Sequence, residues 1–261
     1  MRQDEIKEFL EEKTRQYNQP SFIDSDPIFI PHQFSRKEDI EIAGFLAATL
    51  AWGNRRSILK SSMRLIQLMD NAPYDFVIQH KAHELERFEG FVHRTFQADD
   101  ARYFMKALQH IYRFHGGLQP VMTSPACHSQ QQLFNEPALE GISQLHRLFF
   151  SIIHPARTRK HVSDPGRGSV AKRLNMFLRW MVRSDRQGVD FGIWNSLPPS
   201  RLCCPLDVHS GRVARKLGLI RRKANDLKAL AELNARLRSF DPGDPVKYDF
   251  ALFGLGVFEK F

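Results

Sequence analysis

Apolar residues recur along this chain mostly at intervals of three and four positions, the spacing that gathers them on one face of an α-helix. β-Branched residues are scattered and do not alternate with polar ones, so the pattern predicts no ladder of strands. We therefore expect an all-α fold. The predicted helices cover residues 4–16, 40–52, 57–69, 101–114, 139–153, 170–183, 208–217, 226–240 and 245–258.

Proline, glycine and polar residues separate the predicted helices. Residues 21–34 predict an extended linker, and Gly53-Asn54 predicts a C-terminal cap for the helix that precedes it. Residues 120–137, which contain several glutamines and prolines, predict a surface loop. Two further breaks come directly before helices with candidate chemistry, at 164–169 and 198–205.

Length and hydropathy place limits on the class of protein. The chain has 261 residues, of which 42% are hydrophobic, enough for one large domain or two small ones with a packed core. It shows no basic start followed by an apolar run, and no uninterrupted apolar window of about 18 residues. We therefore expect a protein of the cytoplasm, associated with the nucleoid, with no membrane as a partner.

Positive charge is concentrated in one part of the chain. The formal net charge is +9. Residues 157–223 contain 16 Lys and Arg against 4 Asp and Glu, a net charge of +12, so the rest of the chain is slightly acidic. A concentrated basic segment favours a polyanionic partner, because neutralised phosphates release their counterions. A basic surface that only interacts with water remains an alternative.

Three cysteines are present, Cys127, Cys203 and Cys204. The number is odd, two of them are adjacent, and none belongs to a Cys-x-x-Cys pair, so a disulfide framework, a zinc finger and an iron–sulfur cluster are all poorly supported. We expect buried, inert thiols, no metal site and no cofactor.

The first segment with candidate chemistry leads into the helix predicted from Val208. An aspartate after a proline at a helix start is good capping chemistry, since Asp207 would accept hydrogen bonds from backbone N–H groups of the next turn. A functional carboxylate at the same position is the alternative. The segment reads Pro205-Leu206-Asp207-Val208-His209-Ser210-Gly211-Arg212-Val213-Ala214-Arg215-Lys216-Leu217.

The second segment combines a glycine-containing turn with the start of another helix. It reads Gly166-Arg167-Gly168-Ser169-Val170-Ala171-Lys172-Arg173-Leu174-Asn175-Met176-Phe177-Leu178. Two registers are open. In one, Lys172 stands in the first turn of the helix, followed by Asn175 and Leu178. In the other, the turn is Pro165-Gly166-Arg167-Gly168, and Val170 takes the place of the lysine.

These two segments, in this order, resemble the helix-hairpin-helix DNA glycosylase superfamily, which has a glycine-rich hairpin, a lysine in the next helix, and an Asp-x-His-x-x-Arg segment further along. The apolar helix Glu41–Leu50 resembles the first barrel helix of that superfamily, and the tail Asp249–Gly256 resembles its last helix. The 35 positions between Lys172 and Asp207 are more similar to the archaeal 8-oxoguanine glycosylase branch than to endonuclease III.

The resemblance implies a fold and a reaction. The fold would be two-lobed and helical, with residues 1–37 and 186–261 in one lobe and 38–185 in the other. The reaction would be removal of a damaged base, with an oxidised purine such as 8-oxoguanine as the leading substrate, from double-stranded DNA by a monomeric enzyme. Asp207 would be the catalytic carboxylate, and Lys172 would be the nucleophile of a glycosylase with AP lyase activity.

These residue types suit the reaction. A carboxylate near C1′ stabilises the positive charge that develops when the C1′–N bond breaks. A neutral lysine attacks C1′, and the positive end of a helix dipole together with nearby Arg173 disfavours its protonated form. The target base must be flipped out of the stack, and the candidates to stack on it are Trp52, Phe191 and Trp194. The expected DNA-binding residues are Asn54, Arg55, Gly166, Arg167, Gly168, Ser169, Arg173, His209, Arg212 and Arg215.

Two other classes of protein remain open at this point. One is a DNA- or damage-binding protein that keeps the fold without catalysing a reaction, and the presence of both Lys172 and Asp207 argues mildly against it. The other is a protein-interaction scaffold whose charge only keeps it in solution, which predicts no affinity for DNA even at low salt.

Overall fold

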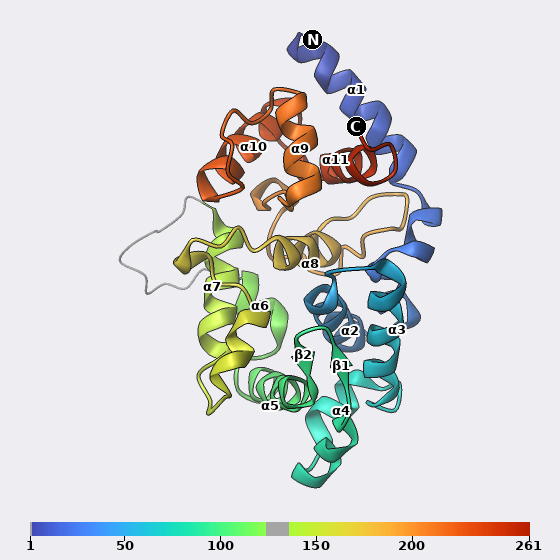
Figure 1. The fold of residues 1–261 in the computed structure, drawn as a ribbon, viewed down its shortest axis with the longest axis vertical. Helices are drawn as coiled ribbons and strands as arrows, with labels where there is room; N and C mark the ends of the chain where they lie inside the picture. Colours follow the sequence, from blue (N-terminus) through green and yellow to red (C-terminus); the bar gives the residue numbers. More distant parts are fainter. Residues whose placement is uncertain (1, 124–135) are drawn as a thin grey trace. The chain divides into compact units, whose positions relative to one another are not determined.

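A computed structural model describes residues 2–123 and 136–261, and these residues are mostly helical (Figure 1). The α-helices are α1 (Gln3–Tyr17), α2 (Lys37–Leu50), α3 (Arg55–Gln67), α4 (Pro73–Gln79), α5 (Ala98–Phe114), α6 (Leu118–Thr123), α7 (Pro137–Phe149), α8 (Lys172–Val182), α9 (Val208–Lys216), α10 (Leu227–Phe240) and α11 (Tyr248–Val257). A short antiparallel pair consists of β1 (Val92–His93) and β2 (Phe96–Gln97). Each of the nine predicted helices has a counterpart, which confirms the predominantly helical class.

The structure also contains elements that the hydropathy pattern did not predict. Helix α4 has seven residues and α6 has six, too few for a period of three and four to show. Strands β1 and β2 have two residues each, so alternation cannot be read from them. The expectation that no strands form was therefore wrong in this detail, because the pairing depends on a turn at Arg94, whose φ is +55°.

Residues 21–34 do not form the extended linker that their prolines suggested. They fold into three 3₁₀ helices, Pro20–Ser25, Pro27–Phe29 and Pro31–Gln33. Proline is favourable at the first position of a helical turn because its φ is already fixed there. Asp26 caps the second turn by accepting a hydrogen bond from the N–H of Ile28 at 3.1 Å, and Ile28 itself is fully buried. The segment is therefore part of a packed core.

The expected cap at Gly53-Asn54 belongs to the next helix. Helix α2 ends at Leu50, and Asn54 Oδ1 accepts a hydrogen bond from the N–H of Ser57 at 3.4 Å, so Asn54 is the N-cap of α3. Gly53 has a left-handed φ of +105°, and a Cβ there would lie 2.5 Å from Nε of Arg94. The turn therefore requires glycine. Of the predicted loop 120–137, residues 124–135, with Cys127, lie outside the described residues.

The described residues divide into two compact units. Unit 1 contains residues 2–22, 136–139 and 164–261, and unit 2 contains residues 23–123 and 140–163. This division differs from the expected lobes, because 164–185 belongs with the chain ends and 23–37 belongs with the central part. The physical reason for the first difference is that Arg179 and Arg183 on α8 are buried against carboxylates from the C-terminal part of the chain.

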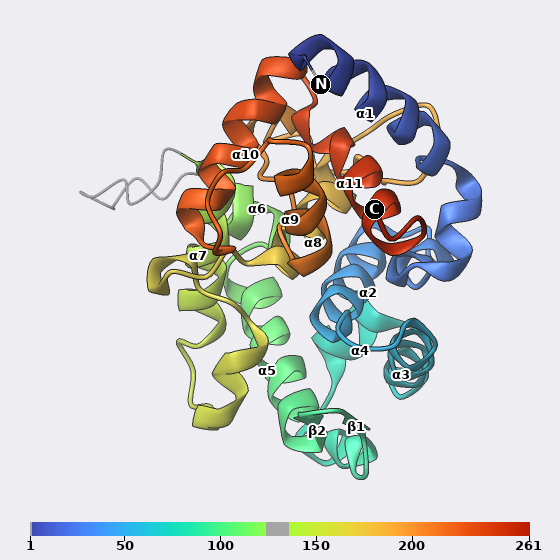
Figure 2. The same ribbon diagram turned by 45° about the horizontal axis from the view of Figure 1, so that its top comes forward.

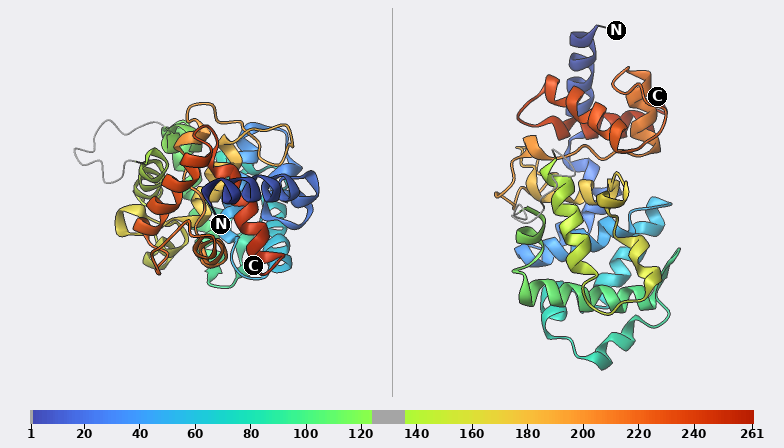
Figure 3. Two further views of the ribbon diagram at one scale, coloured as in Figure 1. Left: turned by 90° about the horizontal axis from the view of Figure 1, so that it is seen from above. Right: turned by 90° about the vertical axis from the view of Figure 1, so that its left-hand side faces the viewer.

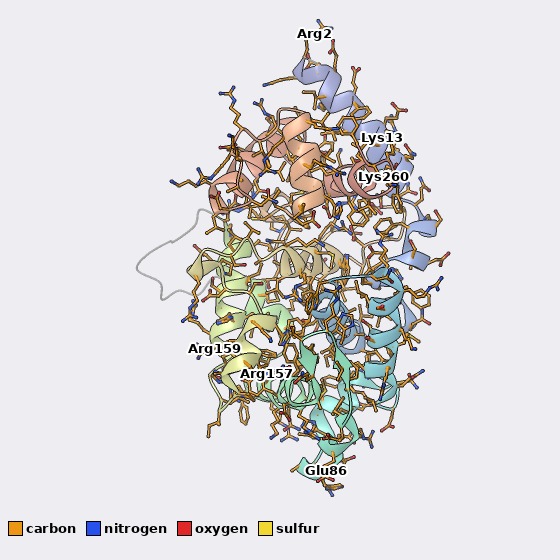
Figure 4. The ribbon with its side chains drawn as sticks, viewed as in Figure 1. Arg2, Lys13, Glu86, Arg157, Arg159 and Lys260 are labelled. Atoms are coloured by element: carbon orange, nitrogen blue, oxygen red, sulfur yellow. The ribbon has the colours of Figure 1, made fainter. Side chains whose placement is uncertain are left out.

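Unit 1 is built around α11, whose residues are almost all buried. Helices α1 and α9 both pack on α11, and α1 lies across it (Figure 2; Figure 3, left panel). Gly254 permits this packing, since a Cβ there would lie 2.1 Å from the ring of Tyr17. At the surface, Lys13 Nζ lies 2.7 Å from a carboxylate oxygen of Glu259, next to Lys260 (Figure 4). The C-terminal segment is thus held to the first helix.

Unit 2 is built around α2, in which every residue from Ile40 to Leu50 is buried and most are apolar, as expected of a helix that is covered on all sides. Phe45 of α2 packs against the rings of Phe104 and Phe149, at centroid distances of 5.9 and 5.7 Å. Helices α3 and α4 and the 3₁₀ turns before α2 contact it, and α5 packs on α4. The core of this unit is therefore aromatic and dense around α2.

A buried carboxylate anchors α5 in unit 2. Asp100 is fully buried and accepts hydrogen bonds from Thr158 Oγ1 at 2.6 Å and from the N–H of Gln97 at 2.9 Å. Arg157 Nη1, labelled in Figure 4, lies 3.0 Å away, and His161 Nε2 lies at 3.4 Å. Burial alone would raise the pKa of Asp100, but the hydrogen bonds from His161, Thr158 and Gln97 outweigh it and lower the pKa to about 2.

Because the pKa of Asp100 is lower in the folded protein than in the unfolded chain, its stabilisation is present above about pH 4 and is lost as the pH falls toward 2. We expect Asp100→Asn to lower the free energy of unfolding by about 3 kcal/mol at pH 7 and to remove about 1 kcal/mol of the stability that the wild type loses between pH 7 and pH 3. Urea unfolding at pH 7 and pH 3 measures both. Asp99→Asn, at an exposed aspartate of the same turn, is the control. Equal losses in the two variants would contradict the assignment.

Candidate active site

Lys172 and Asp207 lie together in unit 1, although 35 positions separate them in the sequence. Lys172 is the first residue of α8 and Asp207 is the N-cap of α9. The Nζ atom of Lys172 is 3.5 Å from Oδ2 of Asp207, and the two side chains are 25% and 26% exposed. The sequence therefore predicted a pair that the structure places in contact and within reach of solvent.

The structure combines one half of each register of the second segment, because the turn spans residues 165–168 whereas the helix begins at Lys172. Ala171 precedes the helix in a left-handed conformation with φ of +46°, and its N–H donates to Ser169 Oγ at 3.1 Å. The Nδ2 group of Asn175 donates to the carbonyl of Val170 at 2.9 Å, which holds the chain before the helix. Lys172, not Val170, occupies the first helical position.

The two carboxylate oxygens of Asp207 have separate tasks. Oδ1 accepts hydrogen bonds from the N–H of His209 at 2.8 Å and from the N–H of Ser210 at 3.0 Å. In return the N–H of Asp207 donates to Ser210 Oγ at 2.9 Å, which completes a capping box. Oδ2 faces Lys172. Capping therefore does not exclude a chemical role for this residue, because it uses Oδ1 and leaves Oδ2 facing Lys172.

The environment of Asp207 keeps its carboxylate ionised. Burial alone would raise the pKa of Asp207. The ammonium group of Lys172 and the N–H groups of Ser210 and His209 outweigh burial, so the pKa lies below its usual value. At neutral pH the site therefore holds a carboxylate at a helix N-terminus, where the helix dipole also favours negative charge.

A polar loop after α9 fixes the position of Asp207. Asn225 Nδ2 donates to the backbone carbonyl of Asp207 at 2.8 Å, and Arg215 Nη2 donates to Asn225 Oδ1 at 2.5 Å. Gly211 makes room for this contact, since a Cβ there would lie 2.5 Å from Asn225 Oδ1. Sequence reasoning did not identify Asn225. The feature of the sequence that could have indicated this contact is Gly211, because a glycine inside a predicted helix often marks the close approach of another group.

A second buried carboxylate, Asp249 of α11, is electrostatically coupled to this pair. It contacts the guanidinium of Arg179, which also lies over the ring of Phe250 at 4.2 Å. The pKa of Asp249 is raised to about 6, mainly by burial. The positive charges of Arg179 and Lys172 lower this pKa, and the negative charge of Asp207 raises it. Sequence reasoning placed this residue in a family-like final helix but gave it no role at the site.

The buried arginines of α8 join these carboxylates into one network. Arg179 Nε lies 3.2 Å from Asp190, and Arg183 bridges Asp190 at 3.0 Å and Asp244 at 2.8 Å. Buried charges of this kind are tolerated only when they are paired. Two of the cations in the basic segment are therefore structural and are not available to a polyanion.

The glycine-containing turn does not present its N–H groups as the resemblance implied. Asp164 accepts from the N–H of Gly166 at 2.9 Å with its side chain, and from Arg167 at 3.1 Å and Ser169 at 3.4 Å with its carbonyl. The N–H of Gly168 donates to Pro165 at 2.8 Å. In this conformation those four groups already have acceptors, so binding of a phosphate by them is not supported. The exposed side chain of Arg167 remains available.

The other predicted DNA-binding residues have different surroundings. His209 and Arg212 are exposed, although Arg212 Nη2 also donates to the carbonyl of Gly256 at 3.1 Å. Arg173 is half-buried, and burial lowers its pKa to about 10. Arg215 supports Asn225, as described above. Asn54 and Arg55 belong to unit 2, at the start of α3.

The proposed stacking residues do not form one group. Trp194 is 1% exposed and packs edge-to-face on Phe177 at 5.4 Å, so it is a core residue and not a stacking platform. Phe191 is half-buried and donates its N–H to the carbonyl of Trp180 at 2.8 Å. Trp52 is half-buried in unit 2, with the guanidinium of Arg94 over its ring at 5.0 Å.

Cys203 and Cys204 are buried free thiols, and burial raises the pKa of both. Among residues 2–123 and 136–261, no group of three or more His, Cys, Asp or Glu side chains is arranged to hold a metal ion. Within the same residues, no helix is both long and apolar enough to cross a bilayer.

Fold and site together define a mostly helical protein whose unit 1 carries an accessible lysine–carboxylate pair of the kind used in covalent and acid–base chemistry. The chain belongs to the family described as "Protein of unknown function (DUF2400)", which matches residues 26–258 and so includes both Lys172 and Asp207. No curated protein and no solved structure matches the chain.

Proposed function

We propose that this protein is a DNA N-glycosylase with AP lyase activity, which excises a damaged base, an oxidised purine first among the candidates. The observation that carries the proposal is the contact between Lys172 Nζ and Asp207 Oδ2 at 3.5 Å, at the facing starts of two helices. A nucleophile with a base beside it, held by a third group, is the arrangement that covalent catalysis needs.

The covalent step begins with the lysine. Lys172 gives up one proton, for which Asp207 Oδ2 is the nearest acceptor, and its neutral amine attacks C1′ of the damaged nucleotide. As the N–C1′ bond forms, the bond from C1′ to the base breaks, and the base leaves with the electron pair and takes up a proton. The C1′–O4′ bond then breaks, O4′ takes up a proton, and a protonated Schiff base forms between Nζ and C1′. Loss of a proton from C2′ forms a C2′–C3′ double bond as the C3′–O bond breaks, so the 3′ phosphate leaves and the strand is cleaved.

Lys172 occupies the first position of α8, and its Nζ lies 3.5 Å from Oδ2 of Asp207. The two side chains attract each other when both are charged, which holds the amine beside the carboxylate. Substrate binding in the site would displace water and bring C1′ between the two groups, where Oδ2 stabilises the positive charge that develops on the sugar.

DNA binding is supported by the exposed cations of unit 1, the unit that carries this pair. Arg167, His209 and Arg212 are exposed, as are Arg221, Arg222 and Lys223 in the loop that follows α9. Removing the two buried arginines of α8 from the segment 157–223 still leaves a strong excess of positive charge. Phosphate contacts by these side chains would hold the strand while one base is flipped out.

The experiment that tests the proposal uses a panel of labelled duplexes, each with one lesion or an abasic site, incubated with the protein and borohydride. Borohydride reduces a Schiff base to a stable amine, so an enzyme of this type becomes covalently attached to the DNA. We expect a trapped complex with the abasic duplex and with at least one oxidised purine. Binding without trapping or base release on every duplex would favour the non-catalytic DNA-binding protein. Lack of binding at low salt would favour the scaffold.

A further inference from the structure

Helix α3 in unit 2 carries a row of cations on its exposed face. Arg56, Lys60 and Arg64 are all exposed and follow one another at intervals of four residues. The opposite face is apolar and buried through Ile58, Leu65 and other side chains. At 1.5 Å per residue, the three cations extend over about 12 Å of the helix axis. Residues 51–69 contain four Lys or Arg and no Asp or Glu.

This arrangement is unfavourable for an isolated helix. Arg55 and Arg56 occupy the first two positions of α3, at the positive end of its dipole, where Asp or Glu would be stabilising. The first turn of α3 contains no acidic residue. Like charges four residues apart also repel, by about 0.2–0.5 kcal/mol for each pair. The sequence therefore carries an electrostatic cost here that an anionic partner would relieve.

The row differs from other surface arginines of the same unit. Arg36, Arg87, Arg102 and Arg157 each have a carboxylate oxygen within 4 Å. Among the described residues, no carboxylate forms such a pair with the three cations of the α3 row. Ion pairing thus neutralises these four arginines but leaves the exposed face of α3 positive.

The β1–β2 turn adds a fourth cation beside α3. His93 Nδ1 lies 3.0 Å from Ser61 Oγ, which holds β1 against the helix (Figure 1). Arg94 is exposed at the turn, and its guanidinium lies over the ring of Trp52 at 5.0 Å. Stacking on the indole limits the directions that the guanidinium can take, which lowers the entropy lost when it binds a ligand.

We propose that this α3 surface, formed by Arg56, Lys60, Arg64 and Arg94, binds the sugar–phosphate backbone of DNA. The proposal rests on the proposed function only in taking DNA as the polyanion. A duplex presents one negative charge for about every 1.7 Å of its axis, which complements a continuous row of cations. An anionic membrane fits less well, because the other exposed residues of α3 are Ser57 and Gln67, and this face has no large apolar side chain to insert into lipid.

The test combines Arg56→Gln, Lys60→Gln and Arg64→Gln in one variant. Glutamine is a good helix former at exposed positions, and loss of like-charge repulsion should leave Tm unchanged or higher. The control variant removes the same charge from three exposed lysines of unit 2, Lys81→Gln, Lys106→Gln and Lys160→Gln. Binding to a short undamaged duplex is followed by fluorescence anisotropy over a series of KCl concentrations.

We expect the α3 variant to raise Kd at least about tenfold near 0.1 M salt, and to reduce the slope of log K against log salt by about 2.7 if all three cations contact phosphates. The control variant should keep both values within about threefold. Equal weakening in the two variants, or no change in either, overturns the proposal. The proposal is also overturned if the α3 variant loses binding to vesicles of phosphatidylserine and phosphatidylcholine but keeps its binding to DNA.

This readout is independent of catalysis, since the duplex contains no lesion. If wild-type protein binds DNA through α3 but is never trapped by borohydride, the proposal of the α3 surface stands and the proposed glycosylase function is rejected. Wild-type protein that is trapped, with undiminished DNA binding in the α3 variant, would reject only the surface.

Discussion

Replacing Lys172 with glutamine should abolish borohydride trapping altogether. Trapping requires a bond between C1′ and an amine, and the Lys172 amine is the one that lies 3.5 Å from the carboxylate proposed to take up its proton. Glutamine is one atom shorter than lysine, remains polar and has no nucleophilic nitrogen. DNA binding should change by less than about tenfold, because one phosphate contact at most is lost. Denaturing electrophoresis measures the amount of trapped protein–DNA complex, and fluorescence anisotropy without borohydride measures the affinity for DNA.

The control for this prediction is Lys228→Gln, at an exposed lysine of α10 in the same unit, which has no assigned role in DNA binding. It removes the same charge and should leave trapping unchanged. Undiminished trapping in the Lys172 variant would show that another amine attacks C1′, and it would remove the lysine from the mechanism. Loss of trapping in both variants would indicate a weakened complex instead of a missing nucleophile.

Asp207→Asn should slow base release by about 100- to 1,000-fold while the protein stays folded. The amide keeps the shape of the side chain but removes the negative charge that stabilises the sugar cation, and losses of this size follow when one electrostatic contact to a transition state is removed. Oδ1 of asparagine can still accept the hydrogen bonds from His209 and Ser210, so the free energy of unfolding should fall by less than about 1 kcal/mol. Single-turnover excision and urea unfolding measure the two quantities.

Helix α10 provides a matched control for this substitution. Asp226 is its N-cap and accepts a hydrogen bond from the N–H of Ala229 at 3.0 Å, but its ion-pair partner is Arg222 and not a lysine of the site. Asp226→Asn should cost a similar amount of stability and leave base release unchanged. If both variants lose stability equally and neither loses activity, Asp207 is a cap only.

The pH dependence of base release follows from the same environment. Because the pKa of Asp207 lies below its usual value, the carboxylate stays charged into mildly acidic solution. Its stabilisation of the folded protein is likewise present at neutral pH and lost only as the pH falls through that lowered value. An activity loss centred well above the usual pKa of aspartate would therefore belong to another group.

The sequence predicted the long helices and the helix starts at Lys172 and Asp207 from local rules, whereas the shared site of these two residues was predicted from the resemblance to the glycosylase superfamily. A period of three and four residues needs only the neighbours in the chain, and a capping aspartate after proline needs only the turn that follows. Both residues stand at helix starts, which punctuation in the sequence marks well. The short helix α4 and the β1–β2 pair were missed because they contain too few residues to show a period.

What the sequence did not predict depends on contacts between distant segments. In the sequence, nothing distinguishes Asn225 from other polar loop residues. Its role depends on the fold, which places it against Gly211 and the carbonyl of Asp207. Asp249 has an ordinary position in an apolar helix, and its raised pKa comes from burial at a site built by three other segments. The glycine-containing turn was predicted wrongly because of a neighbour in the sequence. Asp164 accepts hydrogen bonds from N–H groups of the turn, which the prediction had assigned to a phosphate.

The division of labour within the Asp207 carboxylate affects how relatives of this protein can be interpreted. Selection for a stable α9 alone accepts aspartate, asparagine, serine or threonine at this position, since each of them can cap a helix. Selection for the reaction accepts only aspartate, and only together with a lysine at the start of α8. A set of homologues in which the two positions vary independently would therefore indicate a helix cap, whereas joint loss of both residues in some lineages would identify members that kept the fold after giving up the chemistry.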